Sequence, residues 1–153
     1  MRVALGTDHA GYALKERLKR ELTALGHEVI DHGTHAAEPA VDYPDFCLPV
    51  AEQVASGGAD RGMVFGGSGI GESIAANKVT GVRASVVTSD ETARLTRLHN
   101  DSNVLALGGR TNRDPEAVVR WMRIWLETEF EGGRHTARLE KIAAYEREHS
   151  LRG

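Results

Sequence analysis

The chain has 153 residues, of which 41% are hydrophobic and 27% charged, and it carries a net charge of −3 at pH 7. This length and composition predict one globular domain over 1–153, and the slight acidity gives no basic field for nucleic acid. Cys47 is the single cysteine, which excludes an internal disulfide and fits a reducing compartment. Because it falls in an apolar helical pattern, we expect a buried structural thiol. No apolar run approaches the ~18 residues of a membrane span, and no leader precedes the first strand, so we expect a cytoplasmic protein without a membrane partner.

Short apolar runs alternate with helical patterns along the chain. A strand is expected at 3–6, followed by a helix whose leucines recur at helical spacing up to Leu25, with Gly26 as its C-terminal cap. A strand at 28–31 and a helix from Tyr43 to about Gly57 follow. Further strands are expected at 62–65, 83–87 and 104–107.

Each of these later strands leads into a helix. The first follows a glycine-rich turn, the second has Ser89 as N-cap, and the third has Asp114 as N-cap with Pro115 at its first position. Gly132 and Gly133 then break the chain before a final helix over 134–148. This alternation predicts an α/β fold, an open parallel five-stranded sheet with helices on both faces in a Rossmann-like three-layer sandwich.

The glycine-rich turn is the most informative segment for function. Residues 65–78 read Phe-Gly-Gly-Ser-Gly-Ile-Gly-Glu-Ser-Ile-Ala-Ala-Asn-Lys. Glycines between a strand and a helix can aim several backbone N–H groups at an anion, or at negative charge that develops in a reaction. Ser68 and Glu72 are the reactive side chains within this loop.

Other functions of such a loop match the sequence less well. A dinucleotide fingerprint needs glycine at position 72, a P-loop needs a lysine before Lys78, and a hydrolase elbow needs glycine at position 70. The order Ser68, Asp90, His99 would still suit a hydrolase triad. A nucleotide-binding module, a serine hydrolase and a plain tight turn therefore remain alternatives at this point.

Chemistry-bearing residues cluster around the predicted strand ends. Asp8 and His9 follow the first strand, the glycine loop the third, and Arg110 the fifth, while His99 and Asn100 lie just before the fifth. Because ligands of open parallel sheets bind beyond the carboxyl ends of the strands, we expect these residues to form one rim with acid, base, cation and oxyanion donors. Asp31, His32 and His35 lie in a polar loop without the spacing of a metal motif, so we expect no metal.

Six motifs in order resemble the type B ribose-5-phosphate isomerases, a family related to galactose-6-phosphate isomerase. The likeness runs from Arg2 to about Arg147. It is carried by Gly6-Thr7-Asp8-His9-Ala10-Gly11, Asp42-Tyr43-Pro44, the glycine loop with Ala75-Ala76-Asn77-Lys78, His99-Asn100-Asp101, Asn103-Val104-Leu105 and Gly132-Gly133-Arg134-His135.

The resemblance implies an aldose–ketose isomerase that acts on a sugar phosphate through an enediolate, with neither metal nor cofactor. Ribose 5-phosphate is the expected substrate, and a tetrose 4-phosphate or hexose 6-phosphate is the alternative. It also implies a homodimer with shared active sites, or a tetramer, in which the C-terminal helix and tail, 134–153, reach a partner subunit.

The resemblance also implies roles for individual residues. Asp8 and His9 would bind the two ends of the sugar phosphate, His99 would move a proton at the ring oxygen, and Asn100 would bind hydroxyls. Tyr43 would shape the pocket. The amides of Gly67, Ser68, Gly69, Ile70 and Gly71 would hold the enediolate oxygens with help from the Ser68 hydroxyl, and Arg110, Arg134 and Arg138 would bind the phosphate.

Position 66 departs from the commonest family pattern. Many members have a cysteine base just before the glycine loop, whereas this chain has Gly66. A subset of the family has glycine there and a glutamate just after the loop, which is Glu72 here. We therefore expect Glu72 to be the proton-transfer base, although a first-turn glutamate can also simply stabilise its helix.

Overall fold

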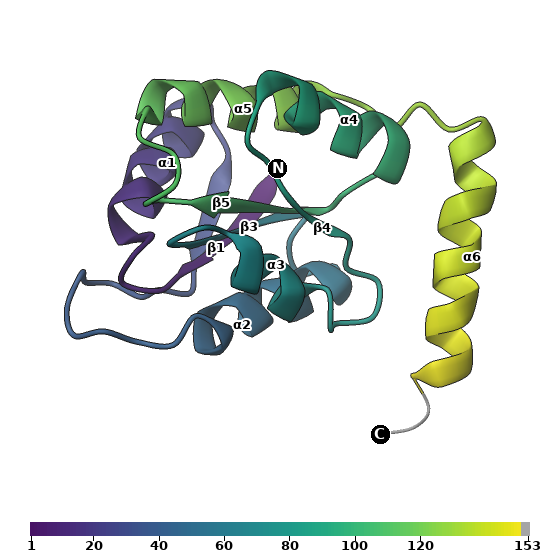
Figure 1. Cartoon of the computed structure of the whole chain (residues 1–153), viewed down its shortest axis with the longest axis horizontal. Coiled ribbons are helices and arrows are strands. Elements are labelled where there is room, and N and C mark those ends of the chain that lie inside the picture. Colours follow the sequence, from purple (N-terminus) through teal and green to yellow (C-terminus); the bar gives the residue numbers. More distant parts are fainter. Residues whose placement is uncertain (151–153) are drawn as a thin grey trace.

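The computed structural model describes residues 1–150, so the last part of the predicted tail lies outside the described residues. Strands and helices alternate strictly up to the last helix, which follows another helix (Figure 1). In chain order the elements are β1 (Arg2–Thr7), α1 (Tyr12–Ala24), β2 (Glu28–Asp31), α2 (Pro44–Ala55), β3 (Arg61–Gly66), α3 (Ile70–Ala76), β4 (Ala84–Val86), α4 (Asp90–Asn100), β5 (Val104–Gly108), α5 (Pro115–Glu127) and α6 (Arg134–His149).

The five strands form one parallel sheet in the order β2-β1-β3-β5-β4, which confirms the predicted α/β class. From β1 the chain first moves outward to β2 and then crosses back to β3 on the other side of β1. The order therefore reverses between β1 and β3, and this reversal opens a crevice at their carboxyl ends. Thr7 pairs with Phe65 at that edge, so the loops after β1 and β3 start side by side.

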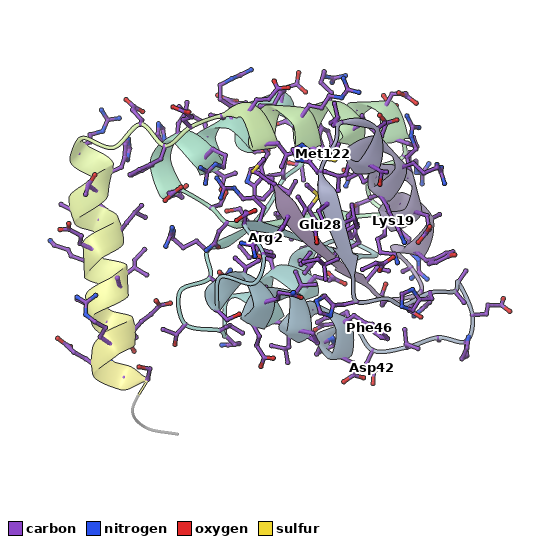
Figure 2. The ribbon with its side chains drawn as sticks, turned by 180° about the vertical axis from the view of Figure 1, so that it is seen from behind. Arg2, Lys19, Glu28, Asp42, Phe46 and Met122 are labelled. Carbon is purple, nitrogen blue, oxygen red and sulfur yellow. The ribbon has the colours of Figure 1, made fainter. Side chains whose placement is uncertain are left out.

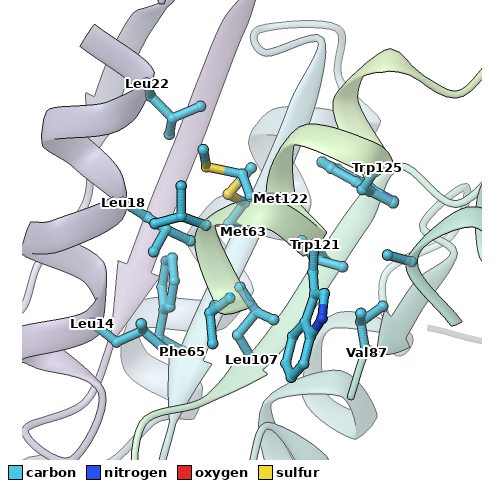
Figure 3. Close-up of a cluster of buried hydrophobic side chains, with 14 of the residues drawn as sticks. Leu14, Leu18, Leu22, Met63, Phe65, Val87, Leu107, Trp121, Met122 and Trp125 are labelled. Atoms are coloured by element: carbon cyan, nitrogen blue, oxygen red, sulfur yellow. The ribbon is translucent and has the colours of Figure 1, made fainter. Parts of the chain in front are cut away.

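Helices cover both faces of the sheet, and each face has its own buried cluster. On one face, α1 and α5 pack on the sheet, and Leu18 of α1 lies near Phe65 of β3 and Met122 of α5 (Figure 3). On the other face, α2 and α3 pack through smaller side chains such as Val50 and Ala76. Cys47 is fully buried in this second cluster, where burial raises the pKa of its thiol, in agreement with the expected structural role.

The edge strand β2 is tied to α1 by a buried ion pair. Figure 2 shows this edge from behind, with Glu28 on β2 and Lys19 on α1. The Asp31 carboxylate lies 2.7 Å from Nζ of both Lys15 and Lys19, and the Lys15 side chain is fully buried. Burial opposes ionisation of Asp31, but hydrogen bonds from the two lysines lower its pKa to about 2. The turn that follows β2 is hydrogen-bonded to the end of β1, because the backbone of Thr7, next to Asp8, bonds to Gly33 and Thr34.

Helix α6 stands beside the rest of the chain rather than on the sheet (Figure 1). Gly132 and Gly133 adopt left-handed backbone angles, with φ of 70° and 58°, which turn the chain before the helix. His135 in the first turn is buried, whereas Ile142 and Tyr145 further along are 50% and 64% exposed. This helix therefore offers an uncovered apolar face. Across 1–150, none of the helices combines the length and apolarity required to cross a membrane.

Candidate active site

Asp8 lies at the carboxyl end of β1 and is nearly buried. Its Oδ1 accepts hydrogen bonds from the amides of Ala10, at 2.9 Å, and Gly11, at 3.1 Å. Asp8 thus stabilises the turn that leads into α1. Its second oxygen, Oδ2, has no hydrogen-bond partner among residues 1–150 and remains free to bind another group.

His9 follows on the same turn. Its Nδ1 lies 3.1 Å from the amide of Val41, which donates to it. The same nitrogen also lies 3.2 Å from the carbonyl oxygen of Val41, so the Val41 backbone can bind Nδ1 in either tautomer, and within residues 1–150 Nε2 is left without a partner. The long loop between β2 and α2 thus fixes the orientation of this ring.

The glycine loop joins β3 to α3 at the neighbouring strand end. The carbonyl groups of Gly66 and Gly67 accept hydrogen bonds from the amides of Gly109, at 2.7 Å, and Arg110, at 2.9 Å, which tie the loop to the end of β5. Gly69 has a φ of 81°, so it supplies the left-handed residue at the start of α3. Within residues 1–150, the amides of Gly67 and Ser68 have no acceptor, which leaves them available to an oxyanion.

Glu72 sits directly behind this loop and is only 3% exposed. A Cβ atom added to Gly66 would lie 1.5 Å from Oε1 of Glu72, so the carboxylate fills the space of a side chain at position 66. Burial raises the pKa of Glu72 above its ordinary value of 4.5, the Asp8 charge adds to the rise, and the amides of Glu72 and Gly69 oppose it. A carboxylate with a raised pKa is a better general base near neutral pH.

Two further predicted residues, from other segments, contact the glycine loop. The Tyr43 ring packs on Gly71, where an added Cβ would lie 2.6 Å from Cζ of the tyrosine. The side chain of Arg110 lies over Gly67, with Cδ 3.6 Å from the position of a Cβ there. The structure therefore brings together one group from a single chain: Asp8, His9, Tyr43, Gly67, Ser68, Gly69, Ile70, Gly71, Glu72 and Arg110.

The remaining candidates form a second group around the C-terminus of α4. The His99 ring stacks on that of His135, with centroids 4.2 Å apart and planes 16° from parallel. Arg138 Nη1 lies 3.5 Å from Nδ1 of His135, which places α6 next to this pair. Arg83 donates a hydrogen bond of 2.9 Å to the carbonyl of Asn100 and so helps to fix the turn after α4.

The expectation that His99 and Asn100 share a rim with Glu72 in one chain is wrong. A helix that follows a strand runs back along the sheet, so the end of α4 lies at the amino ends of the strands. Backbone hydrogen bonds at these amino ends, from the amide of Gly62 to the carbonyl of Asn103 and from the amide of Asn103 to the carbonyl of Arg83, connect the starts of β3, β5 and β4 next to this end of α4. Strand β5 has five residues and spans roughly 15 Å between the two groups.

The alternative hydrolase triad is not formed either. Asp90 at the start of α4 pairs with Arg120, with Nε 2.9 Å from Oδ1, and His99 stacks on His135. The Ser68 hydroxyl accepts a hydrogen bond of 3.2 Å from the Ile70 amide and has no basic partner among residues 1–150. Ser68 is therefore not activated as a nucleophile in this chain.

Sequence reasoning missed Glu131 and His135 as neighbours of His99. His135 was visible only as part of a family motif, and Glu131 carried no signal. Their approach depends on how the two glycines turn α6 against the end of α4, which no local pattern specifies.

Comparison with known proteins identifies the family. The family model for ribose/galactose isomerases matches residues 3–142. The chain is 44% identical to ribose-5-phosphate isomerase B of Escherichia coli over 145 residues, which cover 95% of this chain and 96% of that protein.

This chain belongs to the ribose/galactose isomerase family. As a member it is an aldose–ketose isomerase, as its sequence predicted. Solved structures agree with the fold. Ribose-5-phosphate isomerase B of Clostridium thermocellum superimposes with a TM-score of 0.93 at 50% identity, over 97% of this chain and 99% of that one. The Mycoplasma genitalium enzyme with bound ribulose 5-phosphate gives a TM-score of 0.92 at 37% identity, over 96% and 97% of the two chains.

Proposed function

We propose that the protein interconverts ribose 5-phosphate and ribulose 5-phosphate through an enediolate, without a metal, and that Glu72 is the base. The observation that carries the mechanism is the buried Glu72 carboxylate beside the free amides of the glycine loop. The relatives named as ribose-5-phosphate isomerases, one of them solved with ribulose 5-phosphate, support the choice of substrate.

In the proposed reaction Glu72 removes the proton from C2 of the open-chain aldose. The electron pair moves into a C1–C2 double bond, and the C1 carbonyl oxygen becomes an oxyanion that the amides of Gly67 and Ser68 stabilise. Protonated Glu72 returns the proton to C1, a proton moves from O2 to O1, and the C2 ketone results. Atoms and electrons balance within the sugar, so no redox cofactor is required.

Before this step the furanose ring must open, which we assign to His99. The phosphate would be bound by Arg110, Arg134 and Arg138, whose guanidinium groups form charge-assisted hydrogen bonds with phosphate oxygens. Asn100 would bind sugar hydroxyls, and Asp8 and His9 would bind the sugar phosphate at the other side.

These roles require two chains for each site. The roughly 15 Å between the groups at the two ends of β5 is longer than one pentose phosphate can bridge. In a homodimer, the His99 group of one subunit can face the Glu72 group of the other. The exposed apolar side chains of Ile70 and Ile74 on α3, both 58% exposed, and of Ile142 and Tyr145 on α6 support such an interface.

A substrate panel tests the proposal. The values of kcat/KM would be measured for ribose 5-phosphate, allose 6-phosphate, galactose 6-phosphate and erythrulose 4-phosphate, before and after exhaustive treatment with EDTA. We expect ribose 5-phosphate to have the highest value and EDTA to leave it unchanged. A higher value for a hexose or tetrose phosphate would overturn the substrate, and a loss of activity restored by a divalent metal would overturn the metal-independent mechanism.

A further inference from the structure

Three side chains at the junction of α4 and α6 point potential metal ligands at one place. One ring nitrogen each of His99 and His135 and one carboxylate oxygen of Glu131 all lie within 4.8 Å of one another. Oε2 of Glu131 lies 3.7 Å from Nε2 of His99 and 3.8 Å from Nε2 of His135. These distances are too long for hydrogen bonds. They are near the separation of about 3.4 Å between two ligands of a tetrahedral zinc ion with bonds of about 2.0–2.1 Å.

The buried nitrogen of His135 is an independent sign of a missing ligand. The His135 side chain is only 6% exposed, and its Nε2 has no hydrogen-bond partner among residues 1–150. Buried polar atoms almost always have a partner, so an unpaired imidazole nitrogen aimed at a carboxylate and a second imidazole requires an explanation. A cation bound between the three groups would satisfy it.

The chemistry of the cluster selects the class of metal. Two imidazole nitrogens and one carboxylate oxygen suit Zn²⁺, whereas Mg²⁺ and Ca²⁺ prefer sites made of oxygen. The His99 side chain is 34% exposed and that of Glu131 is 50% exposed, so both can shift and a water can complete the coordination. His99 must tilt out of its stack on His135 for both nitrogens to face one ion.

We propose that His99, Glu131 and His135 form a binding site for Zn²⁺ that inhibits the enzyme. The inhibition follows from the proposed function, because a bound ion would occupy the nitrogen with which His99 acts in ring opening. Arg138 Nη1 lies 3.5 Å from Nδ1 of His135 and can only donate, so ligation of a metal by Nε2, which places the ring proton on Nδ1, requires the guanidinium to move away. Because the guanidinium also repels a cation, we expect binding that is reversible by chelators rather than a permanent structural ion.

Binding is tested without reference to turnover. The purified, EDTA-treated full-length protein would be titrated with Zn²⁺ in competition with a chromophoric chelator. Wild type should bind one Zn²⁺ per chain, and Glu131→Gln should weaken this binding at least tenfold. Glu129→Gln, a change of the same kind at an exposed position on the same segment, should leave it unchanged. Equal affinities in wild type and Glu131→Gln would overturn the site, since the other histidines of the chain would then account for the binding.

A second variant and a second measurement guard against misfolding. His135→Asn should also weaken Zn²⁺ binding at least tenfold, and circular dichroism would establish that both variants fold. Zn²⁺ should raise the melting temperature of wild type and of Glu129→Gln but not that of Glu131→Gln. A rise of equal size in Glu131→Gln would contradict the proposal.

Inhibition is measured separately, with ribose 5-phosphate and relative to the uninhibited rate of each variant. Zn²⁺ should inhibit wild type at the concentrations that saturate the site, EDTA should restore the rate, and Glu131→Gln should need at least tenfold more Zn²⁺. Inhibition that is equal in wild type and Glu131→Gln would refute the inhibitory role. If the protein proved inactive on every sugar phosphate, the proposed function would fail while the binding experiment would still decide the metal site.

Discussion

At the scale of single residues, the Glu72 carboxylate takes the volume that a side chain at position 66 would need. A side chain at residue 66 and the Glu72 carboxylate therefore cannot share this space, and we propose that the base extends from residue 72 because residue 66 is glycine. In this chain the absence of a side chain at Gly66 leaves room for the Glu72 carboxylate, and this makes the proposed proton-transfer role of Glu72 testable.

Glu72→Gln should lower kcat by roughly 10²–10⁴-fold, because loss of a general base typically costs that much. In wild type, kcat should fall as the pH drops through the raised pKa of Glu72, since only the carboxylate accepts a proton.

The raised pKa of Glu72 also means that its ionised form destabilises the fold above pH 4.5, so the glutamine variant should be at least as stable as wild type at pH 7. Steady-state kinetics and thermal unfolding measure both effects. A kcat near that of wild type would remove Glu72 from the mechanism.

The alternative positions of the base predict a rescue. In a Glu72→Ala background, Gly66→Cys should restore part of the lost kcat, because the removed carboxylate leaves room for a thiol at the same place. Gly66→Ala in that background is the matched control and should restore nothing. In a chain that keeps Glu72, Gly66→Cys should lower activity, since the new side chain collides with the carboxylate. Equal activity of the cysteine and alanine double variants would contradict this interpretation.

At the scale of elements, the pair of α1 and β2 depends on Asp31. Its carboxylate neutralises Lys15, whose side chain is fully buried, and accepts a hydrogen bond from the amide of Gly33 in the turn beside Asp8. The chain therefore uses a buried charge pair to fix the loop that borders the site.

Asp31→Asn should lower the free energy of unfolding by about 2 kcal/mol, because it removes the nearer of the two carboxylates that contact the buried ammonium of Lys15 and leaves only Glu16, at 3.1 Å. Glu28→Gln, on the exposed face of the same strand, should change it little. The pKa of Asp31 is depressed in the folded chain, so its stabilisation is present above about pH 4 and is lost as the pH falls towards its folded pKa of about 2. Urea unfolding at pH 7 and at pH 3 measures this. A pH dependence unchanged by the asparagine substitution would contradict the assignment.

The order and kind of the elements could be predicted from local patterns, because most strands are short apolar runs and the starts of α4 and α5 carry the side-chain caps Ser89 and Asp114. The glycine loop and Glu72 could be found for the same reason, since they lie within a few residues of one another. The position of His99 could not. Its role depends on which end of the sheet a returning helix reaches, and its contacts with Glu131 and His135 depend on the turn at Gly132.

At the scale of the whole molecule, the group around Glu72 lies at the carboxyl ends of the strands and the group around His99 lies at their amino ends. Helix α6 stands beside the rest of its own chain (Figure 1), and its first turns place Arg138 next to the His99 and His135 pair. Two arginines four residues apart lie on one face of a helix and can bind one phosphate together. The account therefore requires a complete site to combine Glu72 of one chain with Arg138 of another.

Mixed dimers test this central claim most directly. Glu72→Ala and Arg138→Ala homodimers should each be nearly inactive, because every site lacks one group. A purified heterodimer of the two variants, selected with two different affinity tags, has one site with both substitutions and one with neither. It should recover about half of the wild-type activity. Heterodimers that form but remain as inactive as their parents would show that each site lies within a single chain.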